Sequence, residues 1–212
     1  MKKAGKILLG IFIPIIIIGA GLGGFVIWDN WEKRPAEWTF AAPVLDFPIA
    51  NLSVIHIIQG YGNMPWGAFH NGIDFGCNAS VNILAPCNVR VSYIETWLYS
   101  PEKGLWQTEV HFATTWNYEF CLTFESWAEN ETFANLQRAQ VLLEVNQKVL
   151  RGAVLGTLLY HGEGCHIHFG MKYKDEGICP YQLFTLEAKT IVDNLFALYN
   201  PTGIPCNDTS MR

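Results

Sequence analysis

Residues 67–76 read GAFHNGIDFG, and residues 164–170, much later in the chain, read GCHIHFG. The polar positions in both stretches are spaced as on β-strands, because side chains at positions i, i+2 and i+4 of a strand lie on one face. His70 and Asp74 would then share one face of a strand, and the two histidines of the second stretch would share a face of another. The pattern predicts two strands that each present a polar pair.

Two imidazoles and a carboxylate can provide the three protein ligands of a catalytic zinc ion, which leaves a fourth position for water. A further imidazole beside that water could act as an acid or a base. Neither stretch specifies a metal site by itself, because pairs such as His166 and His168 are often hydrogen-bonded pairs without a metal. Strand alternation points Cys165 away from His166, so this cysteine is a poor ligand candidate.

In this order the two stretches resemble the signatures of the lysostaphin/LytM-type zinc endopeptidases, His-x-Gly-Ile-Asp-Phe and Gly-x-His-x-His-Phe. The Ala85-Pro86 pair with its following alternating run, and the segment from Val145 to Gly156, are also similar to segments of that family. The resemblance covers roughly residues 50–170, which is most of the chain beyond its apolar N-terminal segment. It implies a mainly β fold with an antiparallel, lysostaphin-like sheet domain.

The resemblance also assigns roles to residues at matching positions. It makes His70, Asp74 and His168 the ligands of one Zn²⁺ ion, and it makes His166 a catalytic histidine. Zinc lowers the pKa of its bound water and polarises the scissile carbonyl group. His166 could orient that water or stabilise the developing oxyanion. A supporting hydrogen-bonding role for His166 is the alternative.

One position departs from the family pattern, which places a second catalytic histidine in a Tyr-x-His-Leu segment on an intervening strand. The best match is residues 124–127, FESW, which puts Ser126 where that histidine would stand. A serine hydroxyl cannot replace an imidazole as an acid or base near neutral pH. Three outcomes are open: Glu125 or His161 substitutes, zinc and His166 suffice at a lower rate, or the protein binds its target without cutting it.

The resemblance implies a zinc-dependent endopeptidase that cleaves peptide bonds in cell-wall, peptidoglycan-like cross-links outside the cytoplasm. The alternative is a catalytically degenerate, zinc-binding member of the fold that binds wall or partner proteins and regulates another hydrolase. A third reading is an adhesion module in which the zinc ion is structural.

The N-terminal segment predicts a membrane anchor. Residues 7–28 carry no charge over 22 positions and follow three lysines, a pattern that suits a single span with its N-terminus in the cytoplasm. A cleaved signal peptide is the competing interpretation, under which the protein is secreted. Both place the remaining chain outside the cytoplasm. The predicted organisation is an anchor at 1–28, a stalk at 29–43, a peptidase domain at 44–178, and a C-terminal helix and tail at 179–212.

Between these ends, short alternating segments broken by Gly, Pro and Asn predict an antiparallel β domain. The clearest are residues 53–58, 89–98, 107–113, 118–124 and 154–160. The stretch from Trp127 to Asn146 could be helical or a loop. Residues 180–199 carry Leu183, Leu186, Ile191, Leu195 and Leu198 at helical spacing, which predicts a helix packed on the sheet.

All six cysteines follow the apolar segment, and an even count suits disulfides in an oxidising compartment. The expected pairs are Cys77–Cys87 and Cys179–Cys206. Four Asn-x-Ser/Thr sequons, at Asn51, Asn78, Asn130 and Asn207, make surface glycosylation plausible.

The outer part of the chain is acidic. Residues 35–212 contain nine Lys and Arg against 17 Asp and Glu, a net charge of −8. No basic stripe is present, which argues against a nucleic-acid partner. A neutral or cationic polymer is the better electrostatic match.

Overall fold

The computed structural model describes residues 35–208. They belong to a unit that begins at Pro35 and contains every element discussed below. The predicted anchor at residues 1–28 lies outside the described residues. Within the described range, no helix is both long and apolar enough to cross a bilayer.

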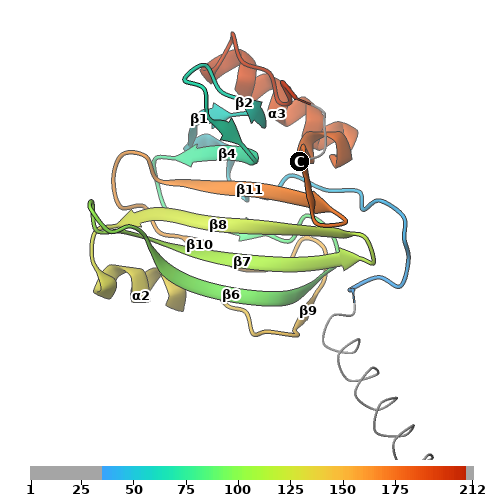
Figure 1. The fold of residues 1–212 in the computed structure, drawn as a ribbon, viewed down its shortest axis with the longest axis horizontal. Coiled ribbons are helices and arrows are strands. Elements are labelled where there is room, and N and C mark those ends of the chain that lie inside the picture. Colours follow the sequence, from blue (N-terminus) through green and yellow to red (C-terminus); the bar gives the residue numbers. More distant parts are fainter. Residues whose placement is uncertain (1–34, 209–212) are drawn as a thin grey trace, which may run out of the picture. The chain divides into compact units, whose positions relative to one another are not determined.

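An antiparallel sheet of eight strands forms the framework, as the sequence predicts (Figure 1). Seven strands follow the spatial order β1-β4-β11-β8-β7-β6-β9, and β12 pairs with β11. Their bounds are β1 Ile55–Gln59, β4 Gly72–Cys77, β6 Val89–Ser100, β7 Leu105–Thr115, β8 Tyr118–Ala128, β9 Lys148–Val149, β11 His166–Tyr173 and β12 Glu176–Ile178. Two small sheets complete the β structure, one from β5 Val81–Leu84 and β10 Val154–Leu158, the other from β2 Gly62–Asn63 and β3 Phe69–His70.

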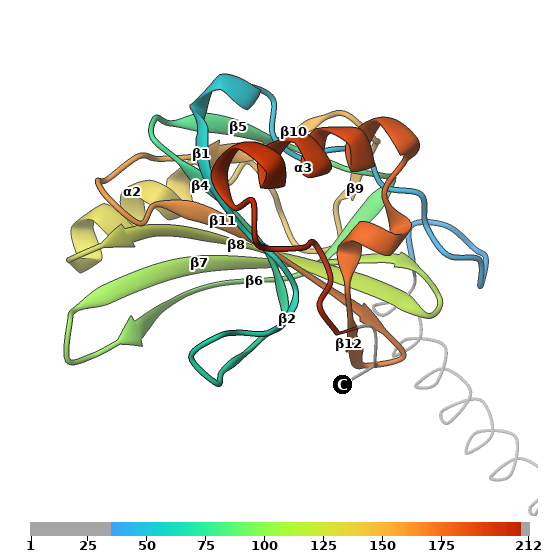
Figure 2. The same ribbon diagram turned by 90° about the horizontal axis from the view of Figure 1, so that it is seen from above.

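The two faces of the main sheet differ in polarity because side chains alternate along each strand. One face is apolar and buried, and its central strands contribute Ile73, Phe75, Phe112, Phe120, Leu122, Phe124, Ile167 and Phe169. Side chains of β5, β10 and helix α3 (Leu186–Tyr199) join the same buried cluster, and Figure 2 shows these elements on one side of the sheet. The other face is therefore free to carry polar groups.

The predicted strands correspond to β1, β6, β7, β8 and β10. The stretch from Trp127 to Asn146, for which helix and loop were both open, contains helix α2 (Glu131–Ala139). Asn130 caps this helix, because its side-chain oxygen accepts a hydrogen bond of 2.9 Å from the backbone N–H of Phe133. The helix packs against β7 and β8.

The C-terminal helix is confirmed, but the predicted apolar stripe is only partly right. A short 3₁₀ helix, η2 (Pro180–Leu183), precedes α3, and Thr185 caps α3 through a bond from the Ala188 N–H. The buried stripe consists of Ala188, Val192, Leu195 and Phe196. Leu186 and Leu198 are 83% and 70% exposed, because only one face of the helix packs on the domain and these two residues lie off that face.

One of the two expected disulfides is confirmed. Cys179 and Cys206 are bonded, which links the end of β12 to the C-terminal tail. The Cys77–Cys87 pair is wrong, because both are buried free thiols. Cys77 instead lies beside Cys165, whose carbonyl accepts a 2.9 Å hydrogen bond from the Cys77 N–H.

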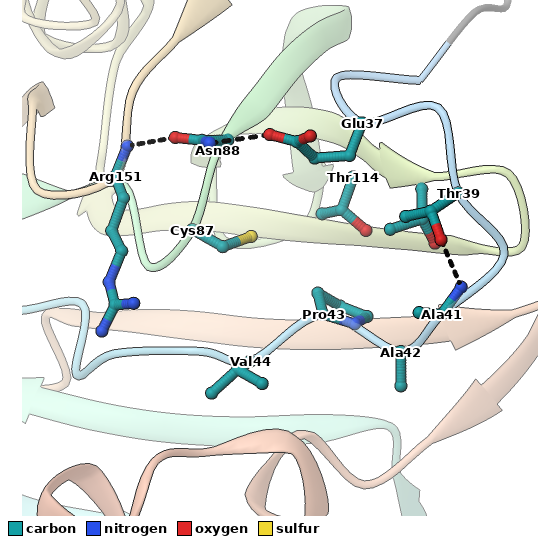
Figure 3. A pocket seen from close by; sticks show the side chains of 11 residues that line it. Glu37, Thr39, Ala41, Ala42, Pro43, Val44, Cys87, Asn88, Thr114 and Arg151 are labelled. Carbon is teal, nitrogen blue, oxygen red and sulfur yellow. Dashed lines mark hydrogen bonds between the residues drawn. The ribbon is translucent and has the colours of Figure 1, made fainter.

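The described part of the predicted stalk lies along the domain. The Glu37 N–H bonds to the Thr114 carbonyl at 2.9 Å, and the Glu37 carboxylate accepts a 2.7 Å hydrogen bond from Asn88. Figure 3 shows these residues around a pocket that also contains the Cys87 thiol and Arg151. The contacts of this unit thus begin before the predicted domain boundary at residue 44.

Candidate metal centre

The polar face of the main sheet brings together the four site residues that the sequence singles out. His70 comes from β3, Asp74 from β4, and His166 and His168 from β11. They line one cleft of about 470 Å³. Its remaining lining residues are Phe69, Asn71, Tyr99, Gln107, Glu109, Cys121, Thr123, Glu125 and Trp127.

Strand register positions two of the ligands. Asp74 and His168 are direct partners in the β4–β11 ladder, so their side chains project from adjacent positions. The prediction that His70 and Asp74 share one strand is wrong. Asn71 separates β3 from β4, and His70 pairs with Gly62 of β2 in a separate small sheet.

The three candidate ligand atoms lie close to one another. His70 Nε2 is 3.1 Å from Asp74 Oδ1, His168 Nδ1 is 2.8 Å from the same oxygen, and the two imidazole nitrogens are 3.2 Å apart. A tetrahedral zinc ion with bonds of about 2.0–2.2 Å holds its ligand atoms about 3.3 Å apart. The observed triangle is therefore slightly smaller than the one a zinc ion would need.

The hydrogen bond at the far side of His70 fixes its tautomer. His70 Nδ1 is 2.7 Å from the carbonyl oxygen of Gly60. A carbonyl only accepts, so Nδ1 carries the hydrogen and Nε2 faces the other ligands. Such an outer partner orients a metal-binding imidazole and sets which nitrogen binds.

The electrostatics of the cluster favour an ionised Asp74. Burial by itself would raise the pKa of Asp74, but hydrogen bonds from His168 and His70 outweigh it and hold that pKa well below its usual range. Burial would lower the pKa of His70, and its bond to Asp74 reverses this and raises it. The carboxylate is thus charged and ready to bind a cation, for which protons on the imidazoles compete.

Gly72 makes room for His168. A Cβ atom at Gly72 would lie 2.5 Å from the His168 ring. Its partner across the β4–β11 ladder, Gly170, instead leaves space for Cys121, whose sulfur would lie 2.9 Å from a Cβ there. The glycine of the first sequence stretch therefore has a steric role at the site.

The donor set fits zinc. Two imidazole nitrogens and one carboxylate oxygen are a known three-ligand combination for catalytic zinc. The three side chains are 12–16% exposed, so solvent can reach the site. A His–Asp–His metal site is thus available, and in the described residues no other cluster of His, Cys, Asp and Glu meets this geometry.

His166 stands beside the ligands without joining them. Its Nδ1 donates a hydrogen bond of 2.6 Å to the Gly164 carbonyl, and its Nε2 lies 3.7 Å from Asp74 Oδ2. The ring centroid of Trp127 is 5.7 Å away. His166 therefore lines the cleft beside the triangle and is not part of it.

Ser126 does not stand in the cleft, which corrects the sequence alignment around the missing histidine. Its side chain is on the buried face with an exposure of 1%. Glu125 lines the cleft instead, and its Oε2 lies 3.3 Å from His166 Nε2. The signal was present in the sequence, because alternation with the apolar Phe120, Leu122 and Phe124 puts residue 125 on the polar face.

The other candidate substitute, His161, lies outside the cleft. Its ring stacks on Phe133 of α2 with a centroid distance of 3.9 Å. It lines a neighbouring pocket with Tyr99 and Trp127. His111 pairs with Glu109 at 2.7 Å.

No family model and no curated protein matches the chain. Several solved structures are similar in fold. A zinc-containing peptidase from Vibrio cholerae has 14% identity and a TM-score of 0.41, over 63% of this chain and 38% of that one. Csd3 from Helicobacter pylori has 18% identity and a TM-score of 0.45, over 74% and 40% of the two chains. The catalytic domain of the antimicrobial peptidase lysostaphin from Staphylococcus simulans has 17% identity and a TM-score of 0.38, over 58% and 84%.

The chain resembles the lysostaphin/LytM-type peptidases in fold. It spans about two fifths of the length of the first two proteins named. The similarity concerns the fold, so an activity has to be argued from the side chains of the cleft.

Proposed function

We propose that the protein is a zinc-dependent endopeptidase that acts outside the cytoplasm. The observation that carries this proposal is the triangle of His70 Nε2, Asp74 Oδ1 and His168 Nδ1, with sides of 2.8–3.2 Å, at the floor of an open cleft. When bound there, zinc would polarise a substrate carbonyl and make water more acidic.

The residues around the triangle suit hydrolysis of a peptide bond. His166 is held by the Gly164 carbonyl so that its Nε2 faces the cleft. An N–H donor at this place can stabilise the oxyanion that forms when water adds to a carbonyl group. Thr123, Gln107 and Asn71 add further polar groups to the lining, which can hold the amide groups of an extended peptide.

The substrate we propose is a peptide cross-link of a cell-wall, peptidoglycan-like polymer. Support comes from the sequence resemblance and from the net charge of −8 over residues 35–212, which disfavours anionic polymers. No lysine or arginine of residues 35–208 lines the cleft. A neutral or cationic peptide segment is therefore the better match.

The test uses the full chain, purified in detergent and loaded with zinc, together with His166→Ala. We expect one zinc ion per chain in both proteins by metal analysis, and release of peptide fragments from wall material by the wild type alone. Zinc-loaded wild-type protein that cleaves neither walls nor cross-linked peptides would sink the proposal.

The same experiment addresses the alternative, a degenerate member that binds wall or partner proteins. One observation favours it: the described lining of the cleft offers only one imidazole besides the two ligands. Wall binding by sedimentation, with zinc bound and without peptide release, would support this second function.

We also propose that residues 1–28 anchor the protein in a membrane. The support is the uncharged stretch of 22 residues behind three lysines. The full chain should float with membranes after carbonate washing. A chain beginning at residue 35 should stay in the supernatant, and recovery of the full chain there would favour a cleaved signal peptide.

A further inference from the structure

Two carboxylates from neighbouring strands approach Nε2 of the catalytic candidate His166, and Glu125 lies closer to it than the candidate ligand Asp74 does, at 3.3 Å against 3.7 Å. Glu125 and His166 are direct partners in the β8–β11 ladder, and the shorter distance joins Glu125 Oε2 to His166 Nε2. The Glu125 side chain is 14% exposed and opens into the same cleft as the ligand triangle. It therefore lies where it can reach both His166 and a molecule in the cleft.

The hydrogen bond at the other side of the His166 ring fixes how it faces Glu125. Its Nδ1 is 2.6 Å from the Gly164 carbonyl oxygen, which only accepts, so Nδ1 carries a hydrogen. Its Nε2 therefore points to the Glu125 carboxyl group and into the cleft.

A purely structural ion pair is a poor explanation for this carboxyl group. Burial raises the pKa of Glu125, and the charges of His166 and His168 counter this only in part. The position thus carries a desolvation cost, which a neutral side chain would avoid. Carboxyl groups with raised pKa values in a cleft are typical of acid–base catalysts.

We propose that Glu125 is a second catalytic residue, which takes the place of the imidazole missing from the middle strand. This inference rests on the proposed peptidase function. The Glu125 carboxylate accepts a proton from the attacking water as the water oxygen bonds to the scissile carbonyl carbon. The carbonyl electron pair moves to its oxygen, and an N–H at Nε2 of His166, the ring nitrogen that faces the cleft, would donate a hydrogen bond to that oxyanion.

The second half of the reaction returns the proton. The oxyanion re-forms its double bond, the carbon–nitrogen bond breaks, and Glu125 passes its proton to the leaving nitrogen. One water and one amide become one carboxylic acid and one amine, and both residues regain their starting states. A carboxyl group with a pKa raised towards neutrality can serve both as acceptor and as donor.

The test compares Glu125→Gln, Glu125→His and Ser126→Ala in the zinc-loaded full chain. Glutamine keeps the shape but cannot accept the proton, so we expect kcat to fall by about 10²–10⁴-fold with KM nearly unchanged. Histidine restores a basic group and should recover a measurable part of kcat. Ser126→Ala changes the next residue on the opposite face and should leave kcat within about twofold of the wild type.

A second readout is independent of turnover. The ¹⁵N resonance of His166 Nε2 should shift in Glu125→Gln and stay unchanged in Ser126→Ala, with and without zinc. A Glu125→Gln protein that keeps the wild-type kcat, or leaves this resonance unmoved, overturns the inference while the peptidase function stands. An inactive, zinc-loaded wild type overturns the peptidase function and this inference with it.

Discussion

Asp74 is the residue on which the other site residues converge. One of its oxygens contacts both ligand imidazoles, at 3.1 and 2.8 Å, and the other lies 3.7 Å from His166. Without a metal, the two shorter contacts are hydrogen bonds, and together with the nearby His166 they hold the carboxylate in its charged form. The side chain therefore contributes to stability, besides its proposed role as a metal ligand.

A pH prediction follows for the zinc-free protein. The pKa of Asp74 is held below its unfolded value of about 3.9, so the folded state gains stability from the charged form above that pH. This gain is lost progressively as the pH falls below about 4. Below about pH 4, urea unfolding should show that the free energy of unfolding falls more steeply with decreasing pH for the wild type than for Asp74→Asn. An equal pH dependence in the two proteins would contradict a lowered pKa of Asp74.

Thiol reactivity gives a second prediction at this scale. Burial raises the pKa of Cys77, Cys87 and Cys121 to about 12 and that of Cys165 to about 11. Because the thiolate is the reactive form, native protein at pH 8 should react very slowly with Ellman's reagent. In denaturant, four thiols should react at once, and two more only after reduction of the disulfide. Rapid labelling of the folded protein would show that these thiols are accessible.

At the scale of elements, strand β4 combines a ligand with two glycines on one face. A side chain at Gly72 would collide with His168, whereas one at Gly76 would meet Ile57 Cβ at 2.9 Å. The first collision involves a candidate metal ligand, and also the Phe169 carbonyl oxygen at 2.7 Å, whereas the second involves an apolar side chain. The two positions therefore compare a collision beside the ligand triangle with one elsewhere on the same strand.

Gly72→Ala should weaken zinc binding at least about tenfold, because the His168 ring must move from its place in the triangle. Gly76→Ala is the matched control on the same strand. It should lower the melting temperature yet keep the zinc affinity of the wild type. Competition with a chromogenic chelator measures both affinities, and equal affinities in the two variants would refute a role for Gly72 in placing His168.

Much of the site was predictable because strand alternation is a strict local rule. Alternation puts Cys165 and His166 on opposite faces of their strand. Along β8 the same rule predicts that Glu125, and not Ser126, lies on the polar face, whereas the match to the family motif pointed to Ser126. The break at Asn71 was not predictable in this way, since it depends on the pairing of His70 with Gly62 in a two-stranded sheet separate from the one that contains β4. The face of α3 was likewise set by packing, which helical spacing alone does not determine.

At the scale of the whole molecule, the C-terminal tail reaches back to the start of the domain. The Tyr61 N–H bonds to the Pro205 carbonyl at 2.9 Å, and the Asn207 N–H bonds to the Tyr61 carbonyl at 3.0 Å. Gly60, whose carbonyl holds His70, lies directly against this tail, since a Cβ there would be 2.2 Å from the Ile204 oxygen. The disulfide at Cys206 secures the same segment.

Removal of this disulfide by the double variant Cys179→Ser/Cys206→Ser should lower the free energy of unfolding by about 2–4 kcal/mol, as is typical for native disulfides. It should also weaken zinc binding, because the Gly60 carbonyl loses its fixed neighbour. Chemical denaturation and chelator competition measure the two effects. Cys87→Ser, which removes a free thiol, is the control variant. An unchanged zinc affinity in the double variant would show that the tail does not influence the metal site.

The link from the tail to His70 makes the candidate metal site sensitive to the redox state of its surroundings. The Cys179–Cys206 disulfide persists where the surroundings are oxidising and is lost where they are reducing. We therefore expect the reduced chain to bind zinc more weakly than the oxidised chain.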